Sequence, residues 1–228
     1  MKKLILALAL TGNLNAIAQE TSSNFSFGAN VQSRYIWRGL QFGGTNPSIQ
    51  PGIEYTTGKF TFGAWGAYSL GTNPVQEMDL YLTFEINNTL SLTVTDYYFP
   101  TEGDVNNYLT LGANTGHVYE ASIAFTSTET FPIGLIIASN FAGASTGATY
   151  IEASYTKTSG AIEYTLFAGG VLGDNNGYYL TDGAGLINLG IDLSKEIQLT
   201  KSFSLPVNTA LIINPDAENV FLTFGFSL

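Results

Sequence analysis

The chain has 228 residues and no cysteine, and 11% of its residues are charged, less than half of the roughly one quarter usual in globular proteins. Its net charge of −10 argues against a surface for nucleic acid, which binds through Lys and Arg, and the lack of cysteine excludes thiol chemistry and cysteine-held metals. No stretch approaches the roughly 18 apolar residues of a spanning helix. The composition therefore suits a membrane protein that crosses with strands, because paired strands satisfy their own backbone hydrogen bonds.

The N-terminus has the pattern of an export signal. Two lysines precede an apolar run over residues 4–10, and Ala16-Ile17-Ala18 supplies a small-x-small cleavage pattern. We therefore expect a signal peptide over residues 1–18 and a mature β-barrel over residues 19–228. Without the two lysines, about 6 basic residues stand against 18 acidic residues, so the mature chain has a net charge of about −12.

Alternation of apolar and polar residues dominates from Phe25 onward and predicts strands, and Gly, Asn, Asp, Pro and Ser mark the breaks between them. Most predicted strands have about ten residues, which is the length of a tilted strand that crosses a bilayer. The predicted strands cover residues 24–38, 47–57, 59–70, 76–86, 90–99, 117–127, 131–142, 148–157, 161–172, 185–196, 200–213 and 218–228. The pattern predicts an all-β fold, a transmembrane antiparallel up-and-down β-barrel of about 12 strands.

Connections between these strands alternate in length. Tight turns such as Thr57-Gly58 and Ser159-Gly160 alternate with longer loops such as 39–46, 100–116 and 173–184. Outer-membrane barrels have short periplasmic turns and longer external loops, so we expect the bacterial outer membrane as the location. Aromatic residues near the predicted strand ends match the girdles of such barrels; they are Trp37, Tyr55, Phe60, Tyr68, Tyr119, Tyr155 and Tyr164.

Several motifs of the first third resemble those of TorF-type porins, a family of uncharacterised bacterial outer-membrane proteins. The motifs are Ser33-x-Tyr35-x-x-Arg38-Gly39, Pro47-x-Ile49-Gln50-x-Gly52-x-x-Tyr55, Gly58-x-Phe60, Gly63-x-Trp65-Gly66, Glu77-x-Asp79-x-Tyr81 and Asp96-Tyr97-Tyr98-Phe99-Pro100. The resemblance covers residues 33–100 and implies an outer-membrane barrel with a proposed transport role. It implies no substrate and no catalytic residue.

The polar faces of the predicted strands carry charges that would point into the barrel. The residues that we single out as a lumen charge cluster are Arg34, Arg38, Glu54, Glu77, Asp79, Glu120 and Glu152. Buried charges must be paired or hydrated. Two interpretations remain open: the side chains plug the lumen, or a narrow aqueous lumen favours cations. We expect the two arginines to contact at least one of Glu54, Glu77 and Asp79.

Alternation places Asp96 on the lipid side, which favours a position at the membrane interface over a bulge that redirects it.

His117 is the one histidine of the chain. It raises the possibility of a barrel-embedded hydrolase, but Glu120 would lie on the opposite face of the strand, and no Gly-x-Ser-x-Gly or His-Glu-x-x-His motif is present. We therefore expect no enzyme activity.

Cofactor and metal signals are weak. The loop Asp174-Asn175-Asn176-Gly177 with Asp182 lacks the spacing of a calcium loop, and its residue types make ordinary turns. We expect no cofactor and no metal site.

The favoured function is a porin-like channel for small hydrophilic solutes with a modest cation bias, filtered by loop 100–116 and by the inward charges. Its expected partners are outer-membrane lipid and an unidentified solute, not nucleic acid. One alternative is a closed structural or partner-binding barrel, which occlusion by Trp65, Tyr81, Phe99 and Arg–carboxylate pairs would favour. The other two are the hydrolase and a soluble lipid-binding β-protein with its apolar faces inside.

Overall fold

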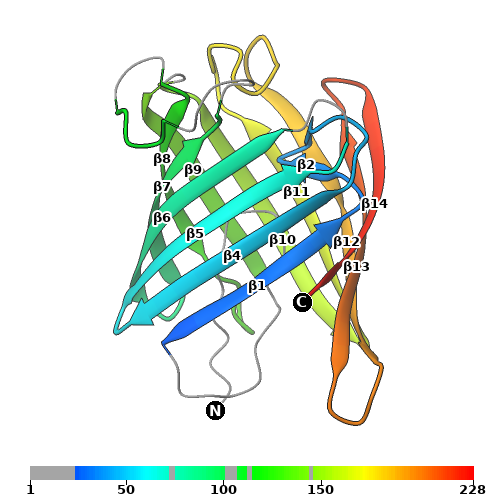
Figure 1. The fold of residues 1–228 in the computed structure, drawn as a ribbon. Helices are drawn as coiled ribbons and strands as arrows, with labels where there is room; N and C mark the ends of the chain where they lie inside the picture. Colours follow the sequence, from blue (N-terminus) through cyan, green and yellow to red (C-terminus); the bar gives the residue numbers. More distant parts are fainter. Residues whose placement is uncertain (1–23, 72–74, 101–106, 112–114, 144–145) are drawn as a thin grey trace.

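The computed structural model describes residues 24–71, 75–100, 107–111, 115–143 and 146–228, and the predicted signal peptide lies outside them. Within these ranges, no helix is long and apolar enough to cross a membrane. Twelve antiparallel strands close into a barrel, as predicted (Figure 1). The wall strands are β1 (Phe25–Gln32), β4 (Ser48–Thr57), β5 (Phe60–Ser69), β6 (Gln76–Asn87), β7 (Leu90–Tyr98), β8 (His117–Phe125), β9 (Ile133–Gly143), β10 (Thr149–Ser159), β11 (Ile162–Val171), β12 (Gly185–Gln198), β13 (Ser204–Asn214) and β14 (Asn219–Ser227).

The strands follow one another around the wall in chain order, apart from the closing contact between β1 and β14. The connections β4–β5, β6–β7, β8–β9, β10–β11 and β12–β13 meet at one end of the barrel, which we call the turn end. The other connections, including the long ones over residues 99–116 and 172–184, lie at the other end, which we call the loop end and which is uppermost in Figure 1. Most connections follow the predicted sorting of short turns and long loops; the exceptions are residues 126–132 at the turn end and residues 215–218 at the loop end.

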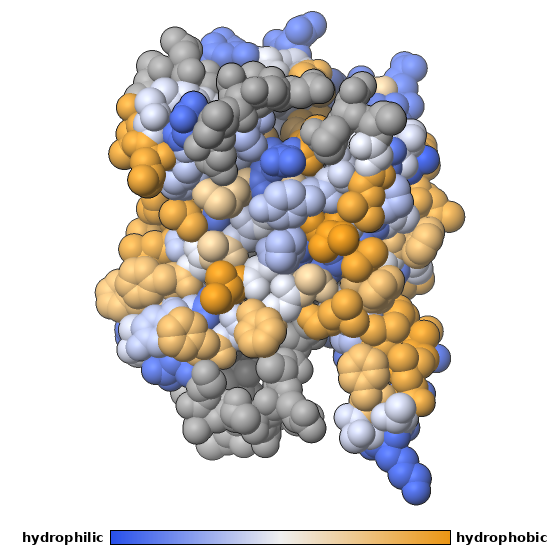
Figure 2. All heavy atoms as spheres, viewed as in Figure 1, coloured by the Kyte–Doolittle hydropathy of each residue, from blue (hydrophilic) through white to orange (hydrophobic). Residues whose placement is uncertain are grey.

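Exposure alternates along the wall strands. On β7, Leu92 and Val94 are 41% and 40% exposed, whereas Thr93 and Thr95 between them are 9% and 6% exposed. Apolar side chains therefore face outward and polar ones face the lumen, and Figure 2 shows apolar residues over much of the visible wall. This arrangement contradicts the alternative of a soluble lipid-binding protein, which would turn its apolar faces inward.

The seam between β1 and β14 is short. Its register joins Asn30 to Ser227, Val31 to Phe226 and Gln32 to Gly225. The chain then leaves the wall, so the half of β14 nearer the loop end pairs with β13 alone. The prediction of one strand over residues 24–38 was therefore wrong beyond Gln32.

The residues after β1 form a small hairpin of β2 (Tyr35–Trp37) and β3 (Leu40–Phe42), separate from the wall sheet. Its side chains Tyr35, Ile36, Trp37 and Leu40 are buried. We call residues 35–42 the plug. Two predictions are thereby corrected: residues 39–46 are not simply an external loop, and Trp37 does not belong to an outer aromatic girdle.

A two-residue turn closes the plug. Arg38 and Gly39 both have positive φ angles, of 49° and 79°, which is the conformation of a type I′ hairpin turn. Gly39 lies directly against the wall, because a Cβ at this position would overlap the backbone carbonyl oxygen of Ile187 on β12. The Asn214 side chain also donates a hydrogen bond to the Gly39 carbonyl, at 3.2 Å.

Aromatic and aliphatic side chains join the plug to the wall in a buried cluster. Tyr35, Trp37 and Leu40 of the plug belong to it. The wall and loop residues of the cluster are Trp65, Ala67, Tyr97, Val118, Ala148, Tyr150, Val171, Tyr179 and Ile187, with Phe42, Tyr81, Phe99 and Tyr178 packed against it. Since these residues include members of β5, β7, β8, β10, β11 and β12, the cluster fills the lumen from wall to wall near the loop end.

The close approach of Gly39 to β12 gives a stability prediction. Replacement Gly39→Ala should lower the free energy of unfolding by about 2–4 kcal/mol, because the left-handed φ and the overlap with the wall both cost energy. Gly58→Ala is the matched control, since Gly58 has a φ of 60° with no atom near the added Cβ. Urea unfolding followed by the fluorescence of the two tryptophans measures both losses. Equal losses would contradict the docking of the turn.

Candidate functional site

An ion pair anchors the plug inside the barrel. The Arg38 guanidinium donates to both carboxylate oxygens of Glu120 on β8, at 2.5 and 2.9 Å, and both residues are buried. The guanidinium also lies 4.5 Å from the ring centroid of Trp37 and 4.6 Å from that of Tyr150. A two-bond contact of this kind fixes geometry as well as charge, so the plug tip is held at a defined place on the wall.

Two tyrosines complete the surroundings of this ion pair. Tyr97 on β7 donates its hydroxyl to Glu120 at 3.0 Å, and the Tyr179 hydroxyl accepts from Arg38 at 2.6 Å. Tyr179 comes from the loop between β11 and β12, and its ring stacks on Trp37 at 5.7 Å. Burial raises the pKa of Tyr179 to about 12, so this phenol stays neutral at physiological pH.

We expected the two arginines to contact Glu54, Glu77 or Asp79, and this prediction was wrong. Arg38 binds Glu120, and Arg34 donates to the Gln41 side chain at 3.0 Å. The physical reason is the inward turn of the chain, which carries Arg38 across the lumen to β8 instead of along β1.

The other predicted carboxylates lie on lumen-facing positions with neutral partners. Tyr81 donates to Glu54 at 2.6 Å. Glu152 on β10 accepts from Tyr150 at 2.5 Å and from Asn188 at 2.8 Å. Tyrosine and asparagine thus take the place of the basic partners that the charge pattern led us to expect.

Glu77 and Asp79 are the most deeply buried carboxylates of β6, at 3% and 0% exposure. Tyr35 of the plug hydrogen-bonds to Glu77. The second Glu77 oxygen has no hydrogen-bond partner among the described residues, and the Asp79 carboxylate accepts a hydrogen bond from the backbone of Tyr98. Trp65, which lies opposite Asp79 in the register of β5 and β6, also has an indole nitrogen without a described partner.

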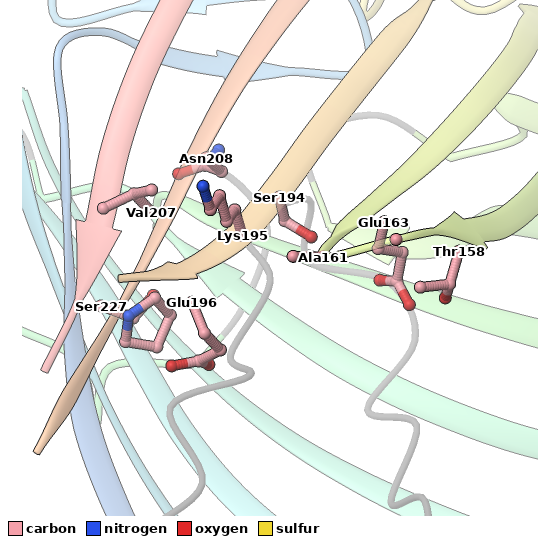
Figure 3. A pocket seen from close by; sticks show the side chains of 11 residues that line it. Thr158, Ala161, Glu163, Ser194, Lys195, Glu196, Val207, Asn208 and Ser227 are labelled. Carbon is pink, nitrogen blue, oxygen red and sulfur yellow. The ribbon is translucent and has the colours of Figure 1, made fainter. Parts of the chain in front are cut away.

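The turn end of the lumen contains a cavity. Its volume is about 280 Å³, and polar side chains of β10 to β14 line much of it (Figure 3). They include Thr158, Glu163, Ser194, Glu196 and Asn208. The lumen is therefore packed at the plug and hollow at its other end.

Asp96 and His117 form a second polar site, on the outer face of the barrel. Asp96 shares its face with the exposed Leu92 and Val94, and the pairing of β7 is regular at this point, so the redirecting bulge is not observed. The Asp96 carboxylate lies 2.8 Å from Nδ1 of His117 and accepts the Tyr108 hydroxyl at 2.7 Å. The second ring nitrogen of His117 faces the Tyr108 carbonyl at 3.0 Å.

This arrangement explains how Asp96 is tolerated on the outer face. The two nitrogens of His117 contact the Asp96 carboxylate and the Tyr108 carbonyl, and the Tyr108 hydroxyl gives Asp96 a second hydrogen-bond partner. The outward His117 and the inward Glu120 lie on opposite faces of β8, as predicted. The partners of His117 are a carboxylate and a carbonyl rather than a serine hydroxyl, so the geometry gives no support to a hydrolase.

Metal-binding candidates are sparse in the described part of the chain. It contains no group of three or more His, Asp and Glu side chains that could hold a metal. In the Asp174 loop, Asp174 accepts the Asn176 amide, and the Asn175 side chain donates to the Thr181 carbonyl. These are turn contacts, as the residue types indicated. The predicted filter loop 100–116 lies partly outside the described residues.

Three residues of the candidate site were not predicted from the sequence. Tyr97, Tyr150 and Tyr179 all contact the Arg38–Glu120 pair or its surroundings. Alternation would have placed Tyr97 and Tyr150 on the inner face, so a signal was present for them. The loop residue Tyr179 had none beyond the pair Tyr178-Tyr179.

These features define the class of protein: a closed antiparallel β-barrel with an apolar outer wall and an internal plug held by a buried ion pair. A family model described as a bacterial protein of unknown function (Gcw_chp) matches residues 18–206. The chain belongs to this family.

No curated protein matches the chain. Among solved structures, three engineered variants of the porin of Rh. blastica match at 12% identity, with TM-scores of 0.39, 0.38 and 0.38. Each match covers 79% of this chain and 55% of the porin, so the chain spans about half the length of these structures. At this similarity they carry no argument about function.

The buried ion pair gives a second stability prediction. Glu120→Gln should lower the free energy of unfolding by about 3–5 kcal/mol, because it leaves the Arg38 guanidinium without its countercharge. Glu163→Gln, at an exposed lumen position near the turn end, makes the same chemical change and should stay within about 0.5 kcal/mol of wild type. Urea titration of the two variants tests this, and similar losses would show that the pair does not hold the plug.

The outer polar site gives a third prediction. Asp96→Asn removes the charge that His117 and Tyr108 share, so the segment 107–111 should exchange its amide hydrogens faster, by about fivefold or more for a loss of about 1 kcal/mol. Hydrogen exchange with mass spectrometry measures this rate. Asp182→Asn in the exposed loop between β11 and β12 is the control. Unchanged exchange in Asp96→Asn would mean that other contacts hold the segment.

Proposed function

We propose that the protein is an outer-membrane barrel whose lumen is closed at rest by the plug. The observation that supports this proposal most directly is the Arg38–Glu120 contact, which joins the tip of the plug to β8 inside the aromatic cluster. Trp65, Tyr81 and Phe99 belong to this cluster or pack against it, which is the occlusion that favours a closed barrel over an open porin.

The outer-membrane location is supported by the outer wall. Apolar side chains alternate outward on strands of about membrane-spanning length, and the short and long connections lie at opposite ends. The resemblance to TorF-type porins over residues 33–100 and the predicted export signal agree with this location. In this orientation the loop end is external and the turn end is periplasmic.

A second candidate is the porin-like channel for small hydrophilic solutes with a cation bias. It is favoured by the lumen-facing carboxylates Glu54, Glu152, Glu163 and Asp192, since the one ion pair described inside the barrel is that of Arg38 with Glu120. Acidic side chains along a water-filled path attract cations and repel anions. In this candidate, transport requires displacement of the plug.

Conductance in planar bilayers separates the two candidates. We expect wild-type protein to show no steady conductance, and a variant with residues 35–42 replaced by a short Gly-Ser linker to conduct with cation selectivity. Heat-modifiable migration on a gel checks that the variant keeps the barrel.

Each contrary outcome has a clear meaning in this experiment. Steady conductance of wild type at the level of the linker variant would refute closure by the plug. A folded linker variant that does not conduct would refute a solute path through the lumen, and anion selectivity would refute the role given to the carboxylates.

A further inference from the structure

One edge of strand β14 is open in the half nearer the loop end. The register of β1 and β14 stops at Gln32 and Gly225, whereas the rest of β14 toward the loop end pairs with β13 alone, beyond the end of β1 in Figure 1. The outward side chains Val220 and Leu222 are 63% and 72% exposed, compared with 41% for Leu92 on β7. This exposure is expected of a strand that lacks one neighbour.

The ladder of hydrogen bonds between β1 and β14 ends at Ser33. The Ser33 amide donates to the Phe224 carbonyl at 2.8 Å, but the Phe224 amide donates to the Ser33 hydroxyl instead of its carbonyl, at 3.0 Å. Alternate residues of an antiparallel strand direct their backbone groups to the same neighbour, so the next two positions of the ladder belong to Leu222 and Val220. Among the described residues, no backbone group bonds to either of them on this side.

Open backbone groups of this kind are strongly unfavourable at the proposed location, because the hydrocarbon of a membrane offers them no partner. The chain contains a segment that fits the open edge. Residues 33–38 directly follow the last paired residue of β1, and they match residues 219–224 of β14 in number. The polarity pattern of β1 also continues through this segment, as the sequence indicated.

The side chains of residues 33–38 suit both faces of an extended wall. Continuation of the register would place Tyr35 opposite Leu222 and Trp37 opposite Val220. Residues that lie opposite each other in a sheet share a face, so both rings would point outward at the loop end, where tyrosine and tryptophan favour the membrane interface. The two arginines of the segment would point into the lumen.

The connection to β4 is long enough for this change. Gln32 pairs with Ser48 of β4, so a strand extended to residue 38 has to return over the length that it gained. Six residues of strand rise about 20 Å, and the chain from residue 38 back to Ser48 can span about 33 Å. Residues 39–47 can therefore close the connection as an external loop while β4 keeps its place in the wall.

We propose that the plug opens by strand exchange: residues 33–38 leave the lumen and extend β1 along the open edge of β14. The inference rests on the proposed closure by the plug and deepens it, since it names the movement that unblocks the lumen. The docked state has the Arg38–Glu120 contact and the aromatic cluster. The exchanged state has the missing backbone hydrogen bonds of Val220 and Leu222 instead, so the two states compete for the same six residues.

Disulfide trapping tests the exchange, because the chain has no cysteine of its own. The test variant is Tyr35→Cys with Leu222→Cys. In the docked state Tyr35 packs on Trp65 inside the barrel, whereas Leu222 lies on the outer face. In the exchanged state the two Cα atoms would lie about 5.5 Å apart, which suits a disulfide. Mild oxidation of the folded barrel in detergent should produce this disulfide, seen as a mobility shift on a non-reducing gel.

Three further pairs make the result specific. Trp37→Cys with Val220→Cys is the next pair of the ladder and serves if the first variant does not fold. Val31→Cys with Phe226→Cys lies in the existing seam and should cross-link readily. Tyr35→Cys with Leu211→Cys should not, because Leu211 is the neighbour of Leu222 on β13, one strand too far from β1.

The docking contact sets how often the exchange occurs. Glu120→Gln in the trapping variant should raise the rate of disulfide formation about tenfold or more, because it removes the countercharge that holds Arg38 in the lumen. Glu163→Gln, the same chemical change near the turn end, should leave the rate unchanged.

Absence of the disulfide from both ladder pairs, while the seam pair forms it, would overturn the proposal. Equal trapping with Leu211→Cys would also overturn it, since the plug would then be loose instead of paired with β14. Conductance distinguishes this inference from the proposed function. A trapped barrel that does not conduct would support the exchange and refute the solute path, whereas a conducting linker variant without trapping would support closure by the plug and refute the exchange.

Discussion

The contact between Arg38 and Glu120 is the interaction on which the interior of this barrel depends. A guanidinium in a lumen packed with aromatic rings is tolerated only beside a countercharge, and Glu120 supplies it from the far side of the barrel. The contact stabilises a turn in which Arg38 itself has a positive φ angle, an uncommon conformation for a residue with a side chain. The stacking of Trp37, Tyr150 and Tyr179 follows from this placement. A single ion pair thus orders a hairpin, a loop and three strands.

The strands of the wall could be predicted from the sequence because the position and the faces of each strand depend on residues close to one another in the chain. Residues such as Leu92, Thr93, Val94 and Thr95 alternate in polarity, and the structure gives them alternating exposure. Tight turns at Gly58 and Gly160, both with positive φ, marked strand ends that the structure confirms. A strand's faces and ends are decided within about ten residues, so one sequence is enough to locate them.

The plug could not be predicted in the same way. Tyr35 and Trp37 continue the alternation of Phe25 and Phe27, so the pattern is the same whether the strand runs on or folds inward. The choice is made by Glu120, which is 82 positions away from Arg38, and by Tyr179, Gly39 and the wall of β12. The lumen-facing positions of the wall carboxylates Glu54, Glu120 and Glu152 followed from alternation, but their partners could not be predicted. Tyrosine and asparagine took the places expected for arginine at Glu54 and Glu152.

The position of the plug along the chain has a consequence for the order of folding. The plug directly follows the first wall strand, yet its anchors Glu120, Tyr179, Ile187 and Asn214 come much later. Contacts between such distant segments form slowly, because long stretches of chain must first be brought together. Trp37 and Leu40 therefore cannot make their native contacts until β8 and β12 are present. The hairpin can therefore make its full set of native contacts only when β8, β12 and β13 are already part of the wall.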